Sequence, residues 1–476
     1  MEDYQGKLDA FIIKRMAATK LPAVSLALIK DGEVVYRRGY GLRDWHAGLP
    51  ATPSTLYGIG SVTKSFTCIA LMQLQERGLL SVEDPVAKYL PFPVAPGGEQ
   101  VKLKHFMSHT SGIPALGYAE QVLRQAIKPR RELVLAGGPE DMLAFMADAG
   151  DWVHARPGER WFYLNEGFAL LGAIVSKVSG LAYTDYVKQH ILAPLGMTRS
   201  FFGRTEVEGD GDAAVPSYTD REGGLQGEDY SYGLITAEGG LISSVEDMAR
   251  YVQMYLRGGL TASGHRLIGE ESLAEMYRPR VATPGEHFEP LGGVLPGGVP
   301  VAGSRMPGWY GFGLSLAPLG WHTMIRHGGS VRVATAEMAF IPALQVGVVV
   351  LASGGGYPMA QFGQYALAQA IGMNPDELPF VQAETRLEAL TGQYETYRGT
   401  TGVKVKRQGG FLVVESLDLD APVTTVLVPE HLADDEATFW TISGTARMPV
   451  QFISTADGGV ELVLERYKYK RTGTRP

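Results

Sequence analysis

The chain has 476 residues, of which 45% are hydrophobic and 20% are charged, and its formal net charge at pH 7 is −8. This length exceeds one ordinary domain and leaves room for a large catalytic core plus a smaller module. The composition is that of a soluble globular protein, and the acidic balance argues against nucleic acid as the main partner.

A single cysteine, Cys68, excludes an internal disulfide, and we expect it to be a small apolar core residue rather than a nucleophile. No stretch approaches the ~18 consecutive apolar residues of a membrane span. Residues 1–15 open with acidic side chains and lack the charged leader and apolar run of a signal peptide. We therefore expect a cytoplasmic protein, or a periplasmic one if a leader has been removed.

The first predicted elements are a helix and a hairpin. Residues 1–20 carry apolar side chains at helical spacing. The apolar segment 23–29 is a predicted buried strand, and 33–40 is a second predicted strand after the tight-turn pair Asp31-Gly32. The N-terminal part of the chain therefore predicts an antiparallel sheet covered by helices.

The next segment holds the only Ser-x-x-Lys of the sequence, Ser61-Val62-Thr63-Lys64, at the start of a helix predicted over 61–76. Residues three apart lie on one helix face, so the Ser61 hydroxyl and the Lys64 amine can share a proton. The positive helix end and burial both disfavour a charged lysine, which makes the amine a proton acceptor. The alternative is a helix cap followed by a solvated lysine. The apolar residues after Lys64 favour burial, so we expect Ser61 to be a nucleophile that Lys64 activates.

A second motif, Tyr163-Leu164-Asn165, lies in a region predicted to be mainly helical, 62–200. A tyrosine beside a serine–lysine pair can relay a proton to a leaving group, and an asparagine can bind a substrate amide. The alternative is a purely aromatic core, although asparagine occurs only at positions 165 and 374. His105 and His109 are four residues apart, but no third ligand is evident, so we expect no metal site.

Residues 203–240 are predicted to be irregular, and the Gly- and Pro-rich stretch 284–308 is predicted to be a long surface loop or lid. Further strands are predicted at 311–316, 323–327, 335–341 and 345–352.

A third motif, Arg326-His327-Gly328-Gly329-Ser330, is predicted to lie where a strand ends. Gly329 would let a substrate backbone lie against the strand edge, and the N–H groups of Ser330 and Ser61 would form an oxyanion hole. His327 could hold a carboxylate or an oxyanion, or help in proton transfer. The alternative for this motif is a surface turn.

The pattern changes near 373–388, where a predicted helix ends. Short predicted strands separated by turn signals follow, which is typical of a small antiparallel barrel: 402–407, 411–415, 423–429, 437–443, 449–454 and 459–467. We therefore expect two domains, 1–378 and 379–476.

The order Ser-x-x-Lys, Tyr-x-Asn, His-x-Gly resembles that of the serine β-lactamase and penicillin-binding-protein superfamily. The chain is most similar to the class C β-lactamase-like branch, which includes D-aminopeptidases, D-Ala-D-Ala carboxypeptidases, esterases and CubicO-type proteins. The resemblance covers roughly residues 5–372 and extends to these stretches: 21–41, 78–91, 103–114, 239–247 and 310–314. The C-terminal strand pattern resembles the lipocalin-like barrel attached to such peptidases.

The resemblance implies an α+β fold, in which an antiparallel sheet is flanked by helices with a helical subdomain and a small antiparallel β-barrel follows. It implies that Ser61 is the acylated nucleophile, Lys64 its base and Tyr163 the relay to the leaving group. Asn165 would bind the substrate amide. Gly329 and Ser330 would line the bound substrate.

His327 stands where β-lactamases typically carry a lysine that meets the substrate carboxylate. Histidine is the form seen in D-aminopeptidase-like relatives, so the resemblance favours a peptide or amide substrate over a β-lactam. We expect a serine hydrolase of the D-aminopeptidase kind that acts through a Ser61 acyl-enzyme. The alternatives are a promiscuous esterase or weak β-lactamase, and a penicillin-binding or sensing protein that turns over poorly. No cofactor is expected, the partner is a small peptide, amide or ester, and a homo-oligomer is left open.

Overall fold

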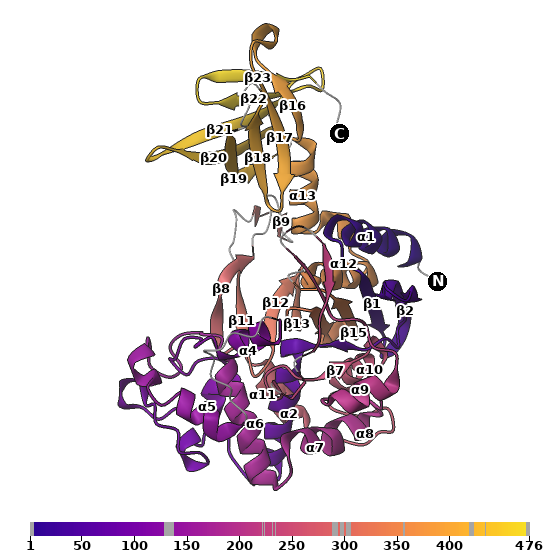
Figure 1. Cartoon of the computed structure of the whole chain (residues 1–476), viewed down its shortest axis with the longest axis vertical. Coiled ribbons are helices and arrows are strands. Elements are labelled where there is room, and N and C mark those ends of the chain that lie inside the picture. Colours follow the sequence, from indigo (N-terminus) through magenta and orange to yellow (C-terminus); the bar gives the residue numbers. More distant parts are fainter. Residues whose placement is uncertain are drawn as a thin grey trace. The chain divides into compact units, whose positions relative to one another are not determined.

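Figure 1 shows the computed structural model of the chain. It describes residues 4–127, 138–220, 222, 224–230, 232–233, 235–287, 294–295, 299–300, 306–355, 358–417, 423–433 and 435–472. The chain divides into two compact units. The sheet unit comprises Met1–Glu286 and Pro307–Met373, and the barrel unit comprises His287–Met306 and Asn374–Pro476.

A nine-stranded sheet forms the centre of the sheet unit, with strand order β3-β2-β1-β15-β14-β13-β12-β11-β8. Neighbouring strands from β2 to β12 in this order pair antiparallel, and the N-terminal hairpin β1–β2 joins the C-terminal strands through the β1–β15 pair. This arrangement confirms the predicted α+β class. The strands are β1 (Ala23–Lys30), β2 (Glu33–Asp44), β3 (Leu49–Pro50), β8 (Val281–His287), β11 (Met306–Tyr310), β12 (Ser315–Leu319), β13 (His322–Ser330), β14 (Ala334–Ile341) and β15 (Val346–Ser353).

Helices cover both faces of this sheet. Consecutive strand residues point to opposite faces. On β15, a Cβ at Gly347 would meet Val252 of α10 (Val245–Leu256), whereas Val348 lies against Gly363 of α12 (Met359–Ala370). Helices α10 and α12 therefore lie on opposite faces. The N-terminal helix α1 (Tyr4–Thr19) packs on α12, where Phe11 stacks on Tyr365.

A helical subdomain lies beside the sheet, on the side labelled α2 to α8 in Figure 1. Its central helix is α2 (Thr63–Glu76), in which every residue from 63 to 74 is buried, and α2 packs on α6 and α7. Its other helices are α3 (Leu103–Met107), α4 (Tyr118–Ile127), α5 (Pro139–Phe145), α6 (Asn165–Ser179), α7 (Tyr183–Val187) and α8 (Ala193–Leu195). No single helix of the described residues has both the length and the apolarity to cross a membrane; α6 and the segment Tyr183–Leu195 pass that test only as a pair bent by 75°.

Several sequence predictions for the sheet unit and its connections differ from the structure. Residues 203–240 contain α9 (Arg204–Asp210), β5 (Ser217–Thr219) and β6 (Leu225–Gly227) and are less irregular than predicted. Of the strand predicted at 311–316, only 315–316 belong to β12, and residues 311–314 form a turn between β11 and β12. Gly313 has a positive φ of 63°, and its site would place a Cβ 2.8 Å from Cys68 Sγ.

The third motif was predicted at a strand end, but β13 runs through it to Ser330. Within the predicted loop 284–308, β8 and β11 occupy the two ends, and β9 (Val294–Leu295) pairs with β10 (Val299–Pro300). The remaining residues of that stretch lie outside the described residues.

The barrel unit is a closed antiparallel barrel, as predicted. Its strands are β16 (Gly392–Glu395), β17 (Gly402–Gln408), β18 (Phe411–Ser416), β19 (Thr424–Leu432), β20 (Glu436–Ser443), β21 (Ala446–Ser454), β22 (Val460–Leu464) and β23 (Tyr467–Arg471). Strand β16 was not predicted, and the single strand predicted at 459–467 is the hairpin β22–β23, with Glu465 at a φ of 52° in its turn. Helix α13 (Pro379–Ala389) adds Leu387 to the apolar interior.

Candidate active site

Ser61 and Lys64 lie where the sheet meets the helical subdomain. Ser61 is in a 3-10 helix, Gly60–Val62, and α2 (Thr63–Glu76) begins two residues later than the predicted start. Lys64 is completely buried, and its Nζ donates hydrogen bonds to Ser61 Oγ at 3.0 Å, Asn165 Oδ1 at 2.7 Å and the Glu238 carbonyl at 2.5 Å. The amine therefore contacts the serine directly and is fixed by two further acceptors.

Burial lowers the pKa of Lys64 to about 7, although the charges of Glu238, Glu120 and Glu166 act in the opposite direction. A buried amine loses its hydration, and this disfavours the ammonium form more than the nearby carboxylates favour it. The pKa of Glu238 is raised, chiefly by its own burial, although the charge of Lys64 acts in the opposite direction. Lys64 is thus a base that can accept a proton near pH 7.

Tyr163 faces the same pair. Its ring lies 4.8 Å from Lys64 Nζ, and its hydroxyl is hydrogen-bonded to the Ser61 side chain. Burial raises the pKa of Tyr163, and the bond to Ser61 offsets only part of that rise. The phenol therefore stays protonated near neutral pH and can pass its proton on.

A buried histidine, His109, fixes the position of Tyr163. The N–H of Phe162 donates to the His109 carbonyl at 2.8 Å, and the N–H of Leu164 donates to its Nδ1 at 3.0 Å. These two bonds flank Tyr163 on both sides. Because Nδ1 accepts, the proton of the neutral ring is on Nε2, which has no hydrogen-bond partner. His109 has a positive φ of 57°, a conformation that such residues adopt only when their surroundings impose it.

The backbone of β13 runs directly past the serine. The Val331 N–H donates to the carbonyl of Ala334, the first residue of β14. Because successive N–H groups along a strand point to opposite edges, the Ser330 N–H points away from β14. A Cβ added at Gly60 would lie 2.5 Å from Ser330 N, and one at Gly329 would lie 1.9 Å from the Ile59 carbonyl oxygen. The glycines allow this close approach of β13 to the Ile59–Ser61 turn.

His327 is buried beside Tyr163, and both of its ring nitrogens have partners. Its Nδ1 lies 2.6 Å from the Gly328 carbonyl, to which it donates, and its Nε2 accepts from the Tyr310 hydroxyl at 2.8 Å. Burial and the charge of Lys64 lower the pKa of His327 to about 3. The ring is therefore neutral, and neither nitrogen is free for a substrate in this structure.

Two acidic residues near Asn165 were not singled out from the sequence. Glu120 is exposed at the start of α4, and its Oε1 lies 3.4 Å from Asn165 Nδ2. Glu166 is buried and accepts a hydrogen bond from the Tyr118 N–H, which ties α4 to α6. Glu166 could have been suspected because it follows Asn165 directly, whereas nothing local marks Glu120.

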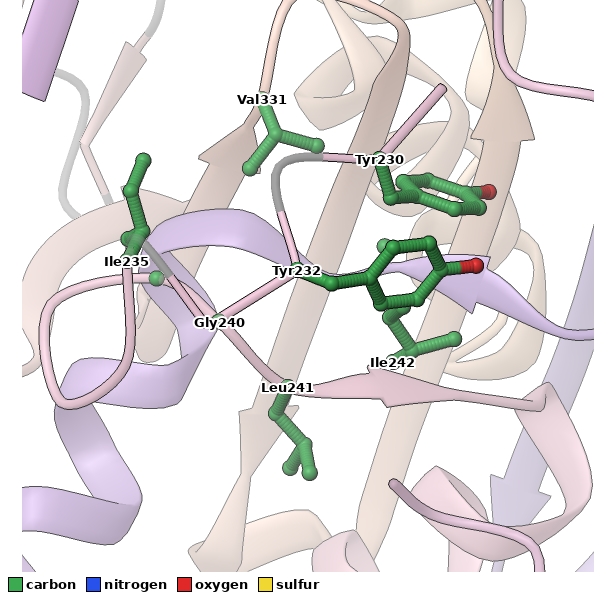
Figure 2. Close-up of a pocket in the computed structure, with 9 residues that line it drawn as sticks. Tyr230, Tyr232, Ile235, Gly240, Leu241, Ile242 and Val331 are labelled. Atoms are coloured by element: carbon green, nitrogen blue, oxygen red, sulfur yellow. The ribbon is translucent and has the colours of Figure 1, made fainter. Parts of the chain in front are cut away.

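An apolar pocket lies next to this group of residues in the chain (Figure 2). Three of its lining residues are sequence neighbours of the site. Gly58 precedes the Ile59–Ser61 turn, Gly239 follows Glu238, and Val331 follows Ser330. Figure 2 shows the rings of Tyr230 and Tyr232 next to each other, with both hydroxyls pointing in the same direction. The other lining residues are Ile235, Gly240, Leu241 and Ile242.

The described residues include no cluster of three or more His, Cys, Asp or Glu side chains arranged to hold a metal ion. The pair His105 and His109 is engaged elsewhere, since His105 Nδ1 accepts from the Lys102 N–H and His109 Nδ1 accepts from the Leu164 N–H.

Comparison with known proteins assigns a family to each part of the chain. The Beta-lactamase family model matches residues 8–371, and the Pab87 octamerisation domain matches residues 375–470. The octameric penicillin-binding protein homologue from Pyrococcus abyssi is 40% identical, with a TM-score of 0.87, over 98% of this chain and 99% of that one.

Two more distant relatives cover less of the chain. Protein flp from Staphylococcus aureus (strain MW2) is 31% identical over 214 residues, and the match spans 44% of this chain but only 41% of that protein's length. The D-amino acid amidase from Ochrobactrum anthropi SV3, complexed with L-phenylalanine, is similar in fold, with a TM-score of 0.58 and 20% identity over 76% of this chain and 96% of that one. These findings confirm the resemblance that the three motifs indicate. Because the family match covers most of the sequence, the chain belongs to the β-lactamase family.

Proposed function

We propose that the protein is a serine hydrolase of the D-aminopeptidase kind, which cleaves peptide or amide bonds through an acyl-enzyme on Ser61. The observation that carries this proposal is the contact at 3.0 Å between Ser61 Oγ and the buried amine of Lys64, whose pKa is lowered to about 7. An amine with that pKa is a competent general base at neutral pH.

In the proposed reaction, Ser61 Oγ attacks the substrate carbonyl carbon while Lys64 Nζ takes the hydroxyl proton. The N–H groups of Ser61 and Ser330 stabilise the oxyanion that forms. Tyr163, whose hydroxyl is bonded to Ser61, passes a proton to the leaving amine as the carbon–nitrogen bond breaks. Water then attacks the Ser61 ester, with the same groups returning the protons, and the free serine is restored.

Charge in the site favours a substrate with a free amine over one with a carboxylate. His327 is neutral and both of its nitrogens are bonded, so this position offers no cation to a carboxylate. Glu120, by contrast, is exposed beside Asn165. We infer that Asn165 binds the substrate amide and that Glu120 attracts the α-ammonium group.

A substrate panel tests the reaction class. Wild type and Ser61→Ala are assayed in parallel with D-aminoacyl p-nitroanilides, p-nitrophenyl esters and nitrocefin. We expect the anilides to be cleaved with a kcat/KM that falls by about 10³- to 10⁶-fold in Ser61→Ala. Cleavage of anilides that survives in Ser61→Ala would refute the acyl-enzyme.

A second variant tests the recognition of the amine. Glu120→Gln keeps the side-chain size and removes the charge. We expect a higher KM for D-aminoacyl anilides with a free amine and an unchanged KM for the matched N-acetylated anilides, because only the former carry an ammonium group. Equal changes for both substrates would refute the role of Glu120 and leave that of Ser61 intact.

A second candidate function is a penicillin-binding protein that is acylated but turns over poorly. The octameric relative from Pyrococcus abyssi, which is described as a penicillin-binding protein homologue, supports this candidate. Intact-mass measurement after addition of a β-lactam would then show a lasting adduct, whereas the hydrolase proposal expects none or a rapidly lost one.

We also propose that the chain assembles into a homo-oligomer. The support is the match of residues 375–470 to an octamerisation domain and the octameric state of the relative that aligns with 98% of this chain.

A further inference from the structure

The segment 237–241 supplies one of the acceptors that fix the Lys64 amine, and α2 itself holds this segment. Thr67, one helical turn after Lys64, is completely buried, and its Oγ1 donates a hydrogen bond to the Ala237 carbonyl at 2.7 Å. The next carbonyl along the segment, that of Glu238, accepts from Lys64 Nζ. Neighbouring side chains on one helix face therefore bind neighbouring carbonyls of one segment.

The Thr67 hydroxyl points to this segment rather than back to its own helix. A threonine inside a helix commonly donates to the carbonyl four residues earlier. For Thr67 that carbonyl belongs to Thr63 and lies 3.5 Å away, whereas hydroxyl hydrogen bonds are usually about 2.7–2.8 Å long. The contact with Ala237 has the usual length, so the hydroxyl binds the segment.

A tyrosine of α7 fixes the direction of that hydroxyl. The Tyr183 hydroxyl lies 2.7 Å from Thr67 Oγ1. Because the single hydroxyl hydrogen of Thr67 goes to Ala237, Tyr183 is the donor in this contact. Burial raises the pKa of Tyr183, so the phenol keeps the proton that it donates. The hydrogen bonds therefore run in one direction, from Tyr183 through Thr67 to Ala237.

A second threonine and close packing hold the rest of the segment. The Leu241 N–H donates to Thr63 Oγ1 at 3.2 Å. A Cβ added at Gly172 of α6 would lie 2.5 Å from the Ala237 Cβ, so the segment packs directly against this helix. Helix α6 also begins with Asn165, whose side-chain oxygen is another acceptor of the buried amine. Helices α2 and α6 together therefore fix both of these acceptors.

The positions of the two acceptors determine where the base points. A neutral amine has two hydrogens and one lone pair. When the hydrogens go to Asn165 Oδ1 and the Glu238 carbonyl, the lone pair faces the third contact, Ser61 Oγ. Lys64 can accept the serine proton only in this orientation. With the Glu238 carbonyl out of place, the amine would rotate and its lone pair would turn away from Ser61.

We propose that Thr67 and Tyr183 are positioning residues for the catalytic base. Through the 237–241 segment, they hold the Glu238 carbonyl where it aims the lone pair of the amine at Ser61. This proposal rests on the acyl-enzyme proposed above and assigns to that reaction two residues that act through the base. Misplacement of a reacting group by about 1 Å can cost about 10²-fold in rate. The loss belongs to the chemical step, so it lowers kcat and leaves KM unchanged.

Three variants and one matched control test the proposal. Thr67→Val removes the hydroxyl and keeps the shape, Thr67→Ser keeps a hydroxyl, and Tyr183→Phe removes the donor to Thr67. Tyr186→Phe is the control, because this buried tyrosine of α7 also bonds a side chain of α2, but its hydroxyl goes to Gln73 Oε1, at 3.3 Å, rather than to the segment. Initial rates with a D-aminoacyl p-nitroanilide give kcat and KM, and thermal denaturation gives the melting temperature.

We expect kcat to fall by about 10- to 100-fold in Thr67→Val with KM unchanged, and to fall less in Tyr183→Phe. Thr67→Ser should keep most of the wild-type kcat, because its hydroxyl can still bind the Ala237 carbonyl. Tyr186→Phe should keep the wild-type kcat whatever its melting temperature. A wild-type kcat in Thr67→Val, or equal losses of kcat in Thr67→Val and Thr67→Ser, would overturn the proposal.

Tyr183→Phe keeps the test decisive if Thr67→Val does not fold. It leaves the Thr67 hydroxyl in place but free to turn back to the Thr63 carbonyl, and a wild-type kcat in this variant would then overturn the proposal. A wild type without any turnover that depends on Ser61 would instead refute the proposed hydrolase. Loss of positioning alone leaves acylation of Ser61 by a p-nitrophenyl ester detectable at a lower rate, so the two failures are distinguishable.

Discussion

The state of the Lys64 amine determines how activity depends on pH. With a pKa of about 7, half of the lysine is neutral at pH 7 and about one part in a hundred is neutral at pH 5. An ordinary lysine, with a pKa near 10.5, would be neutral in only about one molecule in 3,000 at pH 7. We therefore expect kcat/KM to fall about tenfold for each pH unit below about 6 and to level off above about pH 8.

Lys64→Met removes the base and keeps most of the aliphatic volume. We expect kcat/KM at pH 8 to fall by about 10²- to 10⁴-fold, the usual contribution of a general base. Lys88→Met is the matched control, because Lys88 is a half-exposed lysine whose amine pairs with Asp84. The assay is initial-rate hydrolysis of a D-aminoacyl p-nitroanilide between pH 5 and 9.

The same variant changes the pH dependence of stability. Burial lowers the folded-state pKa of Lys64 from 10.5 to about 7. Between these pH values the unfolded chain binds the proton and the folded chain does not, so the unfolding free energy of wild type rises with pH in this window. Relative to Lys64→Met, wild type should gain about 1.4 kcal/mol per pH unit there. A rate profile without an acidic limb near pH 7, together with a stability difference independent of pH, would refute this reasoning.

Two further substitutions test the backbone and the sheet. Gly60→Ala would place a Cβ 2.5 Å from Ser330 N, so we expect kcat to fall by about 10²- to 10³-fold, as when one oxyanion donor is lost. Gly78 also has a positive φ, 70° against 51° at Gly60, but open space around an added Cβ, so Gly78→Ala should lose stability without losing kcat. Similar kcat values for the two variants would contradict the proposed oxyanion hole. Arg326→Met removes the partner of the buried Glu337 carboxylate and should lower the unfolding free energy by about 3–5 kcal/mol in thermal denaturation. Arg326→Met/Glu337→Met should recover most of that loss, and a single variant that melts like wild type would rule out this explanation.

The sequence predicts the parts of the site that depend on local spacing. Ser61 and Lys64 are three residues apart across a 3-10 turn that leads into α2, so their contact follows from local helical spacing. The long strands β1, β14 and β15 were also predicted, because continuous apolar segments identify buried strands.

Long-range contacts determine the features that the sequence did not predict. The neutral state of His327 depends on burial and on the charge of Lys64 from a distant helix, and the position of Tyr163 depends on two bonds to His109. Glu120 reaches Asn165 from a helix 45 residues earlier in the chain. The strand predicted at 311–316 was misplaced because close packing of Gly313 against Cys68, rather than the local pattern, determines where the chain turns.

Trapping of the acyl-enzyme tests the central proposal most directly. The protein is mixed with a D-aminoacyl p-nitrophenyl ester, quenched with acid at short times, digested and analysed by mass spectrometry. We expect the mass of one acyl group on the peptide that contains Ser61, and we expect no adduct in Ser61→Ala. Turnover without any adduct on that peptide, or an adduct on another residue that forms equally in Ser61→Ala, would contradict the account.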